Sequence, residues 1–291
     1  MALDRARLSL DGLSVADAFG EQLLHGGPHA RARALDGRIA PVGRRWVWSD
    51  DTAMAISIVE QLAARGGIEP GELARAFARR YLVEPARGYG RGAHEVLGAI
   101  AAGAPYEEAA RALFQGQGSR GNGGGMRAAP IGAYFAGDPA AAAAHAARSA
   151  APTHAHPDGA AGAVAVAVAA AAVFAGEREP RAVLEAACAH TPPGPTLDGL
   201  HRARSLLGAE PATAAAVLGN GSAVLAADTV PFAVWCAASH LGDYAGALWA
   251  CAGVGGDIDT TCAMAGGIVV GAVGADGIPA EWRASREPLP I

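Results

Sequence analysis

The chain has 291 residues, of which 51% are hydrophobic, only 5% are aromatic and 40 are glycine. A chain of this length buries a large core, and the shortage of aromatic residues predicts that small side chains build it. The formal net charge of -5 gives no basic surface, which argues against a nucleic-acid-binding protein.

Cysteine usage and hydropathy indicate the compartment. The four cysteines form no Cys-x-x-Cys pair and are typical of buried thiols in a reducing compartment. The N-terminus lacks a basic stretch followed by an apolar one, so no signal peptide is visible. Residues 159–176 are uncharged over about the length of a membrane span, but alanine has little tendency to enter a bilayer. We therefore expect a buried helix there, and a cytoplasmic protein without membrane contact.

The first hundred residues are mainly helical in pattern. Apolar residues at helical intervals predict a helix over 8–24, and further helices follow over 52–64, 72–83, 92–102 and 106–114. In the first helix, Asp17 and Glu21 share one face, which is compatible either with a solvated edge or with the wall of a site. Residues 25–45 are rich in Gly, Pro, Arg and His, which predicts a loop.

Residues 115–130 are the most glycine-dense segment, and Pro130 fits the first turn of a following helix. A glycine loop that leads into a helix exposes backbone N–H groups, which can bind an anion such as phosphate. The segment matches neither the P-loop nor the Rossmann fingerprint, since no Lys-Ser/Thr follows it and no clear strand precedes it. A flexible loop without a ligand is the alternative.

The second half predicts helices with short breaks between them. The expected helices are 140–150, 159–175, 181–190, 200–207, 212–218, 229–241 and 244–253. His154 and His156 lie in a polar break and, at this spacing, cannot share a helix face as a metal pair. We expect one all-α domain over 1–291, with its core over about 8–275 and a C-terminal tail over 276–291 that wraps over the surface.

Two short acidic clusters lie far apart in the chain. The first acidic cluster is Ser49, Asp50 and Asp51, and the second is Asp257, Asp259 and Thr260, directly after Gly255-Gly256. On a regular helix the two aspartates of the second cluster point to nearly opposite sides, so they converge only through a tight turn, which glycine permits. Such a turn places several hard oxygen ligands on one small cation. The alternative is a plain helix start, with Asp259 or Thr260 as N-cap and no metal.

Four segments, in this order, resemble the ADP-ribosylglycohydrolase family, which includes the dinitrogenase-reductase-activating glycohydrolase and the ADP-ribosylhydrolases. They are residues 16–20, 49–52, 121–127 with Pro130, and 255–260, and residues 153–157 form a weaker fifth match. The set covers nearly the whole chain, and the compact helical fold of that family agrees with the all-α expectation.

The resemblance implies a binuclear site for two Mg²⁺ or Mn²⁺ ions. Its ligands by position are Ser49, Asp50, Asp51, Asp257, Asp259 and Thr260. A serine stands at 49 where the family usually has threonine, but the hydroxyl is retained. Carboxylates and hydroxyls without thiolates select these hard cations over zinc. The implied substrate-binding residues are Gly121, Asn122, Gly123, Gly124, Gly125, Met126, Arg127, His154 and His156.

The catalytic residues implied by the resemblance are Asp50, Asp51 and Asp257, and one departure affects the set. Many family members carry a glutamate seven residues after the aspartate of the first motif, and this position is Leu24 here. Glu21, one helical turn earlier on the same face, is the candidate replacement. The alternatives are a subfamily with another acceptor, or catalysis by metal-bound water alone.

The implied activity is hydrolysis of the glycosidic bond between ADP-ribose and an acceptor, either a protein side chain or a small conjugate. One alternative is a hydrolase of another nucleoside or ribosyl compound. A second is a non-catalytic regulatory protein that binds ADP-ribose. The expected partner is the ADP-ribose-containing substrate, and a monomer is favoured.

Overall fold

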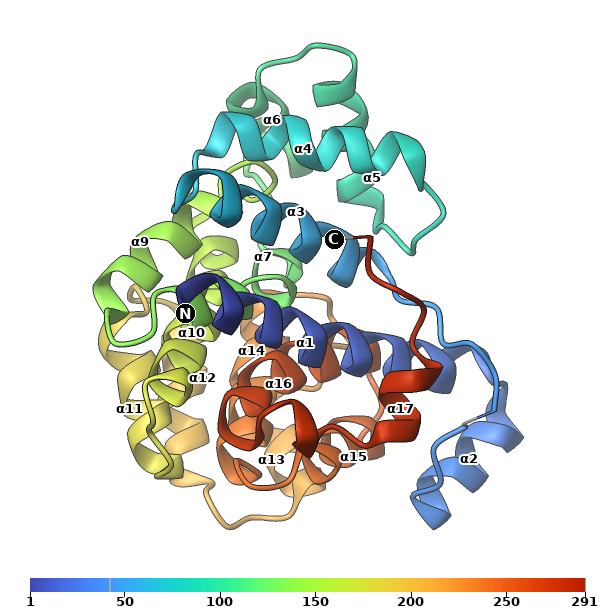
Figure 1. The fold of residues 1–291 in the computed structure, drawn as a ribbon. Helices are drawn as coiled ribbons and strands as arrows, with labels where there is room; N and C mark the ends of the chain where they lie inside the picture. Colours follow the sequence, from blue (N-terminus) through green and yellow to red (C-terminus); the bar gives the residue numbers. More distant parts are fainter. Residues whose placement is uncertain (42, 291) are drawn as a thin grey trace.

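The computed structural model describes residues 1–41 and 43–290, which contain α-helices, one short 3-10 helix and no strand (Figure 1). The predicted all-α fold is confirmed. The first nine helices are α1 (Ala2–His25), α2 (Pro28–Gly37), α3 (Asp50–Arg65), α4 (Pro70–Val83), α5 (Arg91–Ala101), α6 (Tyr106–Gly116), α7 (Gly123–Met126), α8 (Ala129–Tyr134) and α9 (Pro139–Ala150). The remainder are α10 (Pro157–Phe174), α11 (Pro180–His190), α12 (Pro195–Ser205), α13 (Pro211–Leu218), α14 (Ala226–Ser239), α15 (Tyr244–Gly253), α16 (Ile258–Val273), the 3-10 helix η1 (Ala275–Gly277) and α17 (Ala280–Ser285).

Proline sets many of the helix starts. Seven of the described helices, from α2 to α13, begin at a proline. At the first helical position the missing N–H has no intrahelical partner to lose, and the fixed φ suits the helix. Most predicted helices are confirmed within about three residues. The main differences are the earlier starts of α1, at Ala2, and of α12, at Pro195.

The helices α1 and α16 lie against each other in the centre of the molecule, as Figure 1 shows. Small residues allow a very close approach between them. A Cβ atom added to Gly20 would lie 2.4 Å from the Cα of Asp259, and one added to Gly266 would lie 2.4 Å from the Cβ of Ala16. The crossing therefore fixes the start of α16, which carries the second acidic cluster, against α1.

The alanine-rich helix α10 is the one described helix that is long and apolar enough to cross a membrane by length and composition. Within its 18-residue apolar window, 72% is buried inside the protein. It packs against α7, α8, α9, α11, α14 and α16. The prediction of a buried helix is thus confirmed.

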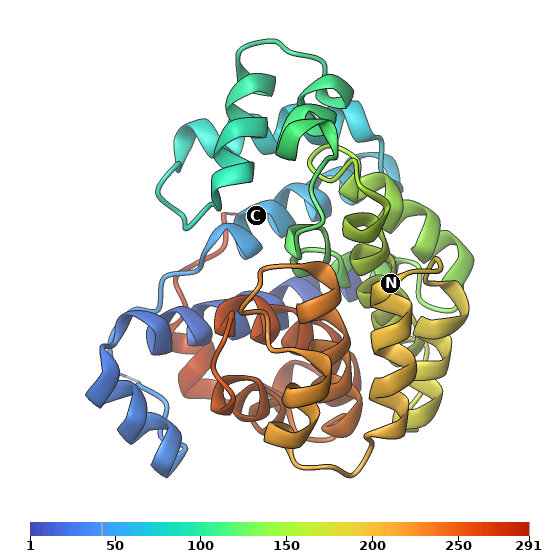
Figure 2. The ribbon, with the colours of Figure 1, turned by 180° about the vertical axis from the view of Figure 1, so that it is seen from behind.

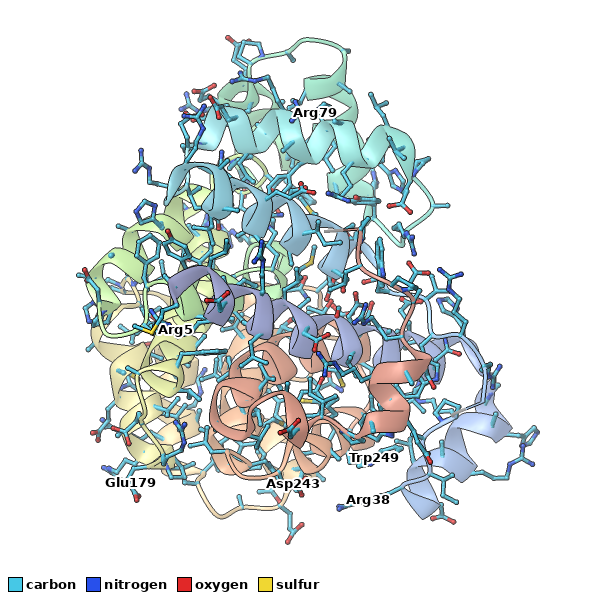
Figure 3. The ribbon with its side chains drawn as sticks, in the orientation of Figure 1. Arg5, Arg38, Arg79, Glu179, Asp243 and Trp249 are labelled. Atoms are coloured by element: carbon cyan, nitrogen blue, oxygen red, sulfur yellow. The ribbon has the colours of Figure 1, made fainter. Side chains whose placement is uncertain are left out.

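The prediction of a loop over residues 25–45 is wrong for residues 28–37, which form α2. Gly27 precedes it with a φ of 76°, and Pro28 occupies its first turn. The arginines and histidine that suggested a loop lie on a short helix with only Ala34 buried. This helix projects from the body of the molecule, and Arg38 lies at its far end (Figure 3).

Most residues of the C-terminal tail are exposed or half-buried, and one aromatic side chain anchors it to the core. Trp282 of α17 is 7% exposed and stacks on Phe19, with ring centroids 4.6 Å apart and an interplanar angle of 8°. Trp46 and Trp249 complete this aromatic cluster, and Trp249 is labelled in Figure 3. Trp282 therefore fixes where α17 lies against the core.

Candidate active site

One cavity of about 650 Å³ brings both acidic clusters and the glycine loop together. It lies where the connection from α6 descends to α7, below the helices α4, α5 and α6, which form the top of the molecule in Figure 2. The expected site residues that line it are Asp50, Asp51, Gly121, Asn122, Gly123, Met126, Arg127, His154, Asp257, Asp259 and Thr260. Segments separated by up to about 200 residues thus form one wall.

The first acidic cluster is positioned by the N-terminus of α3. Ser49 is the N-cap, and its hydroxyl accepts a hydrogen bond of 3.2 Å from the N–H of Asp51. This capping turns the backbone so that Asp50 and Asp51 open the helix inside the cavity wall. Negative side chains are also favoured there by the helix dipole. The Ser49 side chain itself does not line the cavity.

Asp17, on α1, holds the start of α3 in place through hydrogen bonds. Its Oδ2 accepts hydrogen bonds from the N–H of Ser49 at 2.9 Å, from the N–H of Thr52 at 3.1 Å and from the Thr52 hydroxyl at 2.5 Å. The residue is fully buried, and burial raises the pKa of its carboxyl to about 7, although these hydrogen bonds oppose the shift. The sequence was compatible with Asp17 at a solvated edge of the helix or in the wall of a site. The structure places Asp17 behind the site.

The second acidic cluster is formed by a glycine turn and the start of α16. Gly255 and Gly256 have φ values of 73° and 77°, so the predicted tight turn is present. Asp257 is the N-cap, which corrects the alternative of Asp259 or Thr260. The Asp257 side chain makes no capping hydrogen bond and instead accepts one of 2.6 Å from Nδ2 of Asn122. Its carboxylate is therefore directed to the glycine loop.

Burial and mutual repulsion make the carboxylates of both clusters weak acids. Burial is the main cause, and the neighbouring aspartates add to it, so that the pKa values of Asp50 and Asp51 lie well above the ordinary range. The pKa of Asp257 rises to about 7 and that of Asp259 to about 6. Asp51 Oδ2 and Asp259 Oδ1 are buried and have no hydrogen-bond partner among the described residues. Such atoms favour a cation as partner.

The donor set fits Mg²⁺ or Mn²⁺, because it consists of carboxylate and hydroxyl oxygens. The described residues contain no group of three or more His, Cys, Asp or Glu side chains arranged closely enough to hold an ion unaided. The donor set of the two acidic clusters differs from such a group, because it includes the hydroxyl of Thr260 as well as carboxylates. The fit rests on the two unpartnered oxygens and on the convergence of both clusters at one cavity.

Arg127 supplies a buried positive charge beside the first cluster. It is 1% exposed, and its Nη2 donates to the carbonyl of Ser149 at 2.9 Å and to the hydroxyl of Thr153 at 2.8 Å. Burial lowers its pKa to about 9, and the charges of Asp50 and Asp51 oppose the shift. It forms no salt bridge within residues 1–41 and 43–290. Its positive charge therefore offsets part of the negative charge of the acidic clusters without a salt bridge among the described residues.

Several backbone N–H groups of the glycine loop already donate hydrogen bonds within the protein. The N–H groups of Gly118, Gly121 and Asn122 donate to the carbonyl of Leu113, the hydroxyl of Ser119 and the carbonyl of Val224. An anion in the cavity would have to use other N–H groups of the loop. Gly124 and Gly125 do not line the cavity but pack against neighbouring helices.

The two candidate histidines, His154 and His156, have different surroundings. His154 lines the cavity, its Nδ1 lies 2.7 Å from the Thr153 hydroxyl, and burial lowers the pKa of its imidazole to about 3. A neutral ring is thus held beside Gly121 and Gly123. His156 is the N-cap of α10, accepts a hydrogen bond from the N–H of Asp158 and does not line the cavity.

An apolar rim of three exposed side chains also lines the cavity, and sequence reasoning missed it. Phe114, Val224 and Leu225 line the cavity with 60%, 56% and 42% of their surface exposed. Phe114 and Val224 have positive φ values of 52° and 56°, which are costly for such residues. The rim is therefore held in place by the surrounding fold.

A comparison with models of protein families matches residues 1–288 to the ADP-ribosylglycohydrolase family. The chain belongs to this family. ADP-ribosylhydrolase ARH3 of Homo sapiens is 30% identical over 273 residues, which cover 82% of this chain and 74% of the relative. The protein of that name in Danio rerio is 29% identical over 274 residues, which cover 82% of this chain and 73% of the relative.

The fold agrees with this assignment. A solved structure called "ADP-ribosylglycohydrolase-related protein complex" has a TM-score of 0.66 and 24% sequence identity, and the match covers 98% of this chain and 93% of that chain. As a member of the ADP-ribosylglycohydrolase family, the chain is a hydrolase that acts on glycosidic bonds of ADP-ribose.

Leu24, at the position of the glutamate found in many ADP-ribosylglycohydrolases, does not line the main cavity. Leu24 lines a separate hollow with Pro28, Arg31 and Leu35. Glu21 is half-buried, and burial raises the pKa of its carboxyl, an effect to which the charge of Asp257 adds. Its Oε2 also lies 2.9 Å from Nε2 of His25. Glu21 thus neighbours the second cluster, although it does not line the main cavity.

Proposed function

We propose that this chain is a metal-dependent ADP-ribosyl hydrolase that uses two Mg²⁺ or Mn²⁺ ions held by both acidic clusters. The observation that carries the proposal is the hydrogen bond between Asn122 and Asp257, which joins the glycine loop to the second cluster inside one cavity. The substrate is an ADP-ribose group linked to a protein side chain or to a small conjugate.

The cavity has separate regions for the parts of ADP-ribose. The remaining N–H groups of the glycine loop and the start of α7 favour the diphosphate. The apolar rim of Phe114, Val224 and Leu225 suits the flat face of a nucleobase. The ribose next to the scissile bond then lies at the acidic clusters, with the neutral ring of His154 beside it.

The residues of the two clusters hold the ribose in place and define where the bond breaks. When bound, the two ions would polarise the ribose hydroxyls and supply an activated water. Cleavage of a glycosidic bond passes through an oxocarbenium-like transition state, which the negative charge of the surrounding carboxylates favours. In this proposal Glu21, which neighbours the second cluster and whose pKa is raised by burial, accepts a proton from the attacking water.

The direct test measures ADP-ribose release and ADP-ribose binding by wild type and Asp257→Asn, with Mg²⁺, with Mn²⁺ and with a chelator. We expect metal-dependent turnover that falls by about a thousandfold or more in Asp257→Asn. The matched control is Asp276→Asn, an exposed aspartate of η1 that lies outside the cavity. Equal activity of the two variants, or turnover that survives the chelator, would contradict the proposal.

The alternatives give different results in the same experiment. A hydrolase of another nucleoside would show metal-dependent turnover of ribosyl compounds without binding ADP-ribose. A non-catalytic binder would keep its ADP-ribose affinity in Asp257→Asn and show no turnover. The role of Glu21 is tested by Glu21→Gln, which should lower kcat by about a hundredfold while the affinity for ADP-ribose stays within about twofold.

A further inference from the structure

The segment that follows α17 returns to the first acidic cluster. The N–H of Trp46 donates to the carbonyl of Ser285 at 2.7 Å, and the N–H of Glu287 donates to the carbonyl of Trp46 at 2.9 Å. In Figure 1 this segment runs from α17 to the beginning of α3, where the C-terminus lies. The end of the chain is therefore paired with residues just before Ser49.

Glu287 carries a buried charge at this point. It is 6% exposed, and its Oε1 lies 2.6 Å from Nη1 of Arg87. Its Oε2 lies 3.6 Å from Nη2 of Arg45, a residue that is mainly exposed. A carboxylate is costly to bury without a partner, so the close contact with Arg87 determines how this segment is held.

One guanidinium connects three segments. The Arg87 guanidinium carbon lies 3.5 Å from the ring centroid of Trp48, and its Nη1 donates to the carbonyl of Trp48 at 3.1 Å. Its Nε and Nη2 bond to Oε1 of Glu84. Trp48 immediately precedes Ser49, so Arg87 contacts both the C-terminal segment and the approach to the first acidic cluster.

The residue after Arg87 forms part of the cavity wall. Gly88 lines the cavity with a φ of 87°, and a Cβ atom added to it would lie 3.7 Å from Oδ1 of Asp50. A shift of Arg87 would therefore move the wall toward or away from that carboxylate. Arg87 thus supports both the cavity wall at Gly88 and the approach to the first acidic cluster.

We infer that Glu287 and Arg87 form a positioning pair that sets the first acidic cluster and the Gly88 wall for catalysis. The inference rests on the function proposed above, because it assigns these residues a role in the same site. Neither side chain lines the cavity, so both act through Trp48 and Gly88. The C-terminal segment is thus part of the active-site scaffold.

Other contacts anchor the same segment independently of this pair. Trp282 stacks on Phe19 in the core. The carboxylate of Asp11, on α1, accepts from Nε of Arg283 at 2.8 Å and from Nη2 of Arg286 at 2.9 Å. Loss of the Glu287 charge should leave the segment docked, so that a local effect on the site can be separated from unfolding.

The test uses Glu287→Gln, Arg87→Met and the double variant, with Arg283→Ala as the control for the same segment away from the site. Hydrogen–deuterium exchange is measured over residues 46–52 and 86–92, together with Mg²⁺ binding by calorimetry and kcat and KM. We expect faster exchange in both segments for Glu287→Gln. We also expect about tenfold weaker Mg²⁺ binding, with kcat lowered more than KM is raised.

The double variant should be no worse than the worse single variant, because both substitutions break one interaction. Wild-type exchange and wild-type Mg²⁺ binding in Glu287→Gln would overturn the inference, as would an equal effect of Arg283→Ala. If the wild type shows no turnover, the proposed function fails. The exchange measurement then still decides whether the pair holds the two segments.

Discussion

The side-chain amide of Asn122 donates a hydrogen bond of 2.6 Å to Oδ2 of Asp257, although the two residues are 135 positions apart. The same Nδ2 also donates to the hydroxyl of Thr229 at 3.1 Å. Asp257 therefore has one carboxylate oxygen held by the glycine loop. This contact orients the second cluster and the glycine loop together.

The variant Asn122→Ala should lower kcat/KM by about tenfold to a hundredfold, because a hydrogen bond to a charged group is worth about 1.5–3 kcal/mol. The measurement is steady-state ADP-ribose release at saturating Mg²⁺. Asn122→Asp is the sharper comparison, because it keeps the shape but places a second carboxylate against Asp257. It should be worse than alanine, and an activity equal to wild type would remove this role.

The backbone contact between Gly20 and Asp259 gives a second prediction. The Cβ of Gly20→Ala would lie 2.4 Å from the Cα of Asp259, so α1 and the start of α16 must separate. We expect loss of about 1–3 kcal/mol of stability and a marked loss of Mg²⁺ binding, measured by denaturant unfolding and calorimetry. Gly98→Ala is the control, because nothing lies within 4 Å of the added atom on α5. It should be neutral or slightly stabilising.

Local chemistry is what made much of this molecule predictable. Helical periodicity and proline or glycine at helix ends identified most helices, because each of these signals acts within a few residues. The glycines at 255 and 256 predicted the turn that forms, and the aspartates of both acidic clusters line one cavity. Asp257 was expected to serve the site, and the structure directs its carboxylate to Asn122.

The missed features depend on contacts between distant segments. Asp17 has the same helical pattern whether its face is solvated or packed behind α3. The positive φ values of Phe114 and Val224 leave no local signal, since glycine is the residue that marks such positions. The pairing of Glu287 with Arg87 likewise joins two exposed-looking charges that are 200 positions apart.

Asp17 gives a third prediction, because one of its oxygens accepts all three hydrogen bonds that hold the start of α3. Asp17→Ala leaves two buried N–H groups without this acceptor, and we expect a loss of about 2–4 kcal/mol in unfolding free energy. Mg²⁺ affinity should fall as well, because Asp50 and Asp51 lose their fixed direction. Asp17→Asn keeps an acceptor and should lose less of both. A stable Asp17→Ala with normal Mg²⁺ affinity would contradict this role.

The last prediction concerns pH, and its sign follows from the carboxylates. Asp17 and Asp257 have ordinary pKa values of 3.8 and folded-state values of about 7, so near neutrality the folded chain binds more protons than the unfolded chain. Their contribution to stability is therefore lost as the pH rises through about 7. His154 acts in the opposite sense below its ordinary pKa of 6.5, because its folded-state pKa is about 3. The metal-free protein should be most stable slightly below neutral pH.

Thermal unfolding at about pH 6.5 and about pH 8, each with a chelator and with Mg²⁺, tests this expectation. The metal-free protein should unfold at a lower temperature at the higher pH. Added Mg²⁺ should raise the unfolding temperature more at the higher pH, because ionised carboxylates bind the cation and protonated ones do not. Asp257→Asn removes one of the titrating groups and should show a smaller pH effect. A metal-free protein that becomes more stable toward pH 8 would show that these carboxylates are already ionised and compensated in the fold.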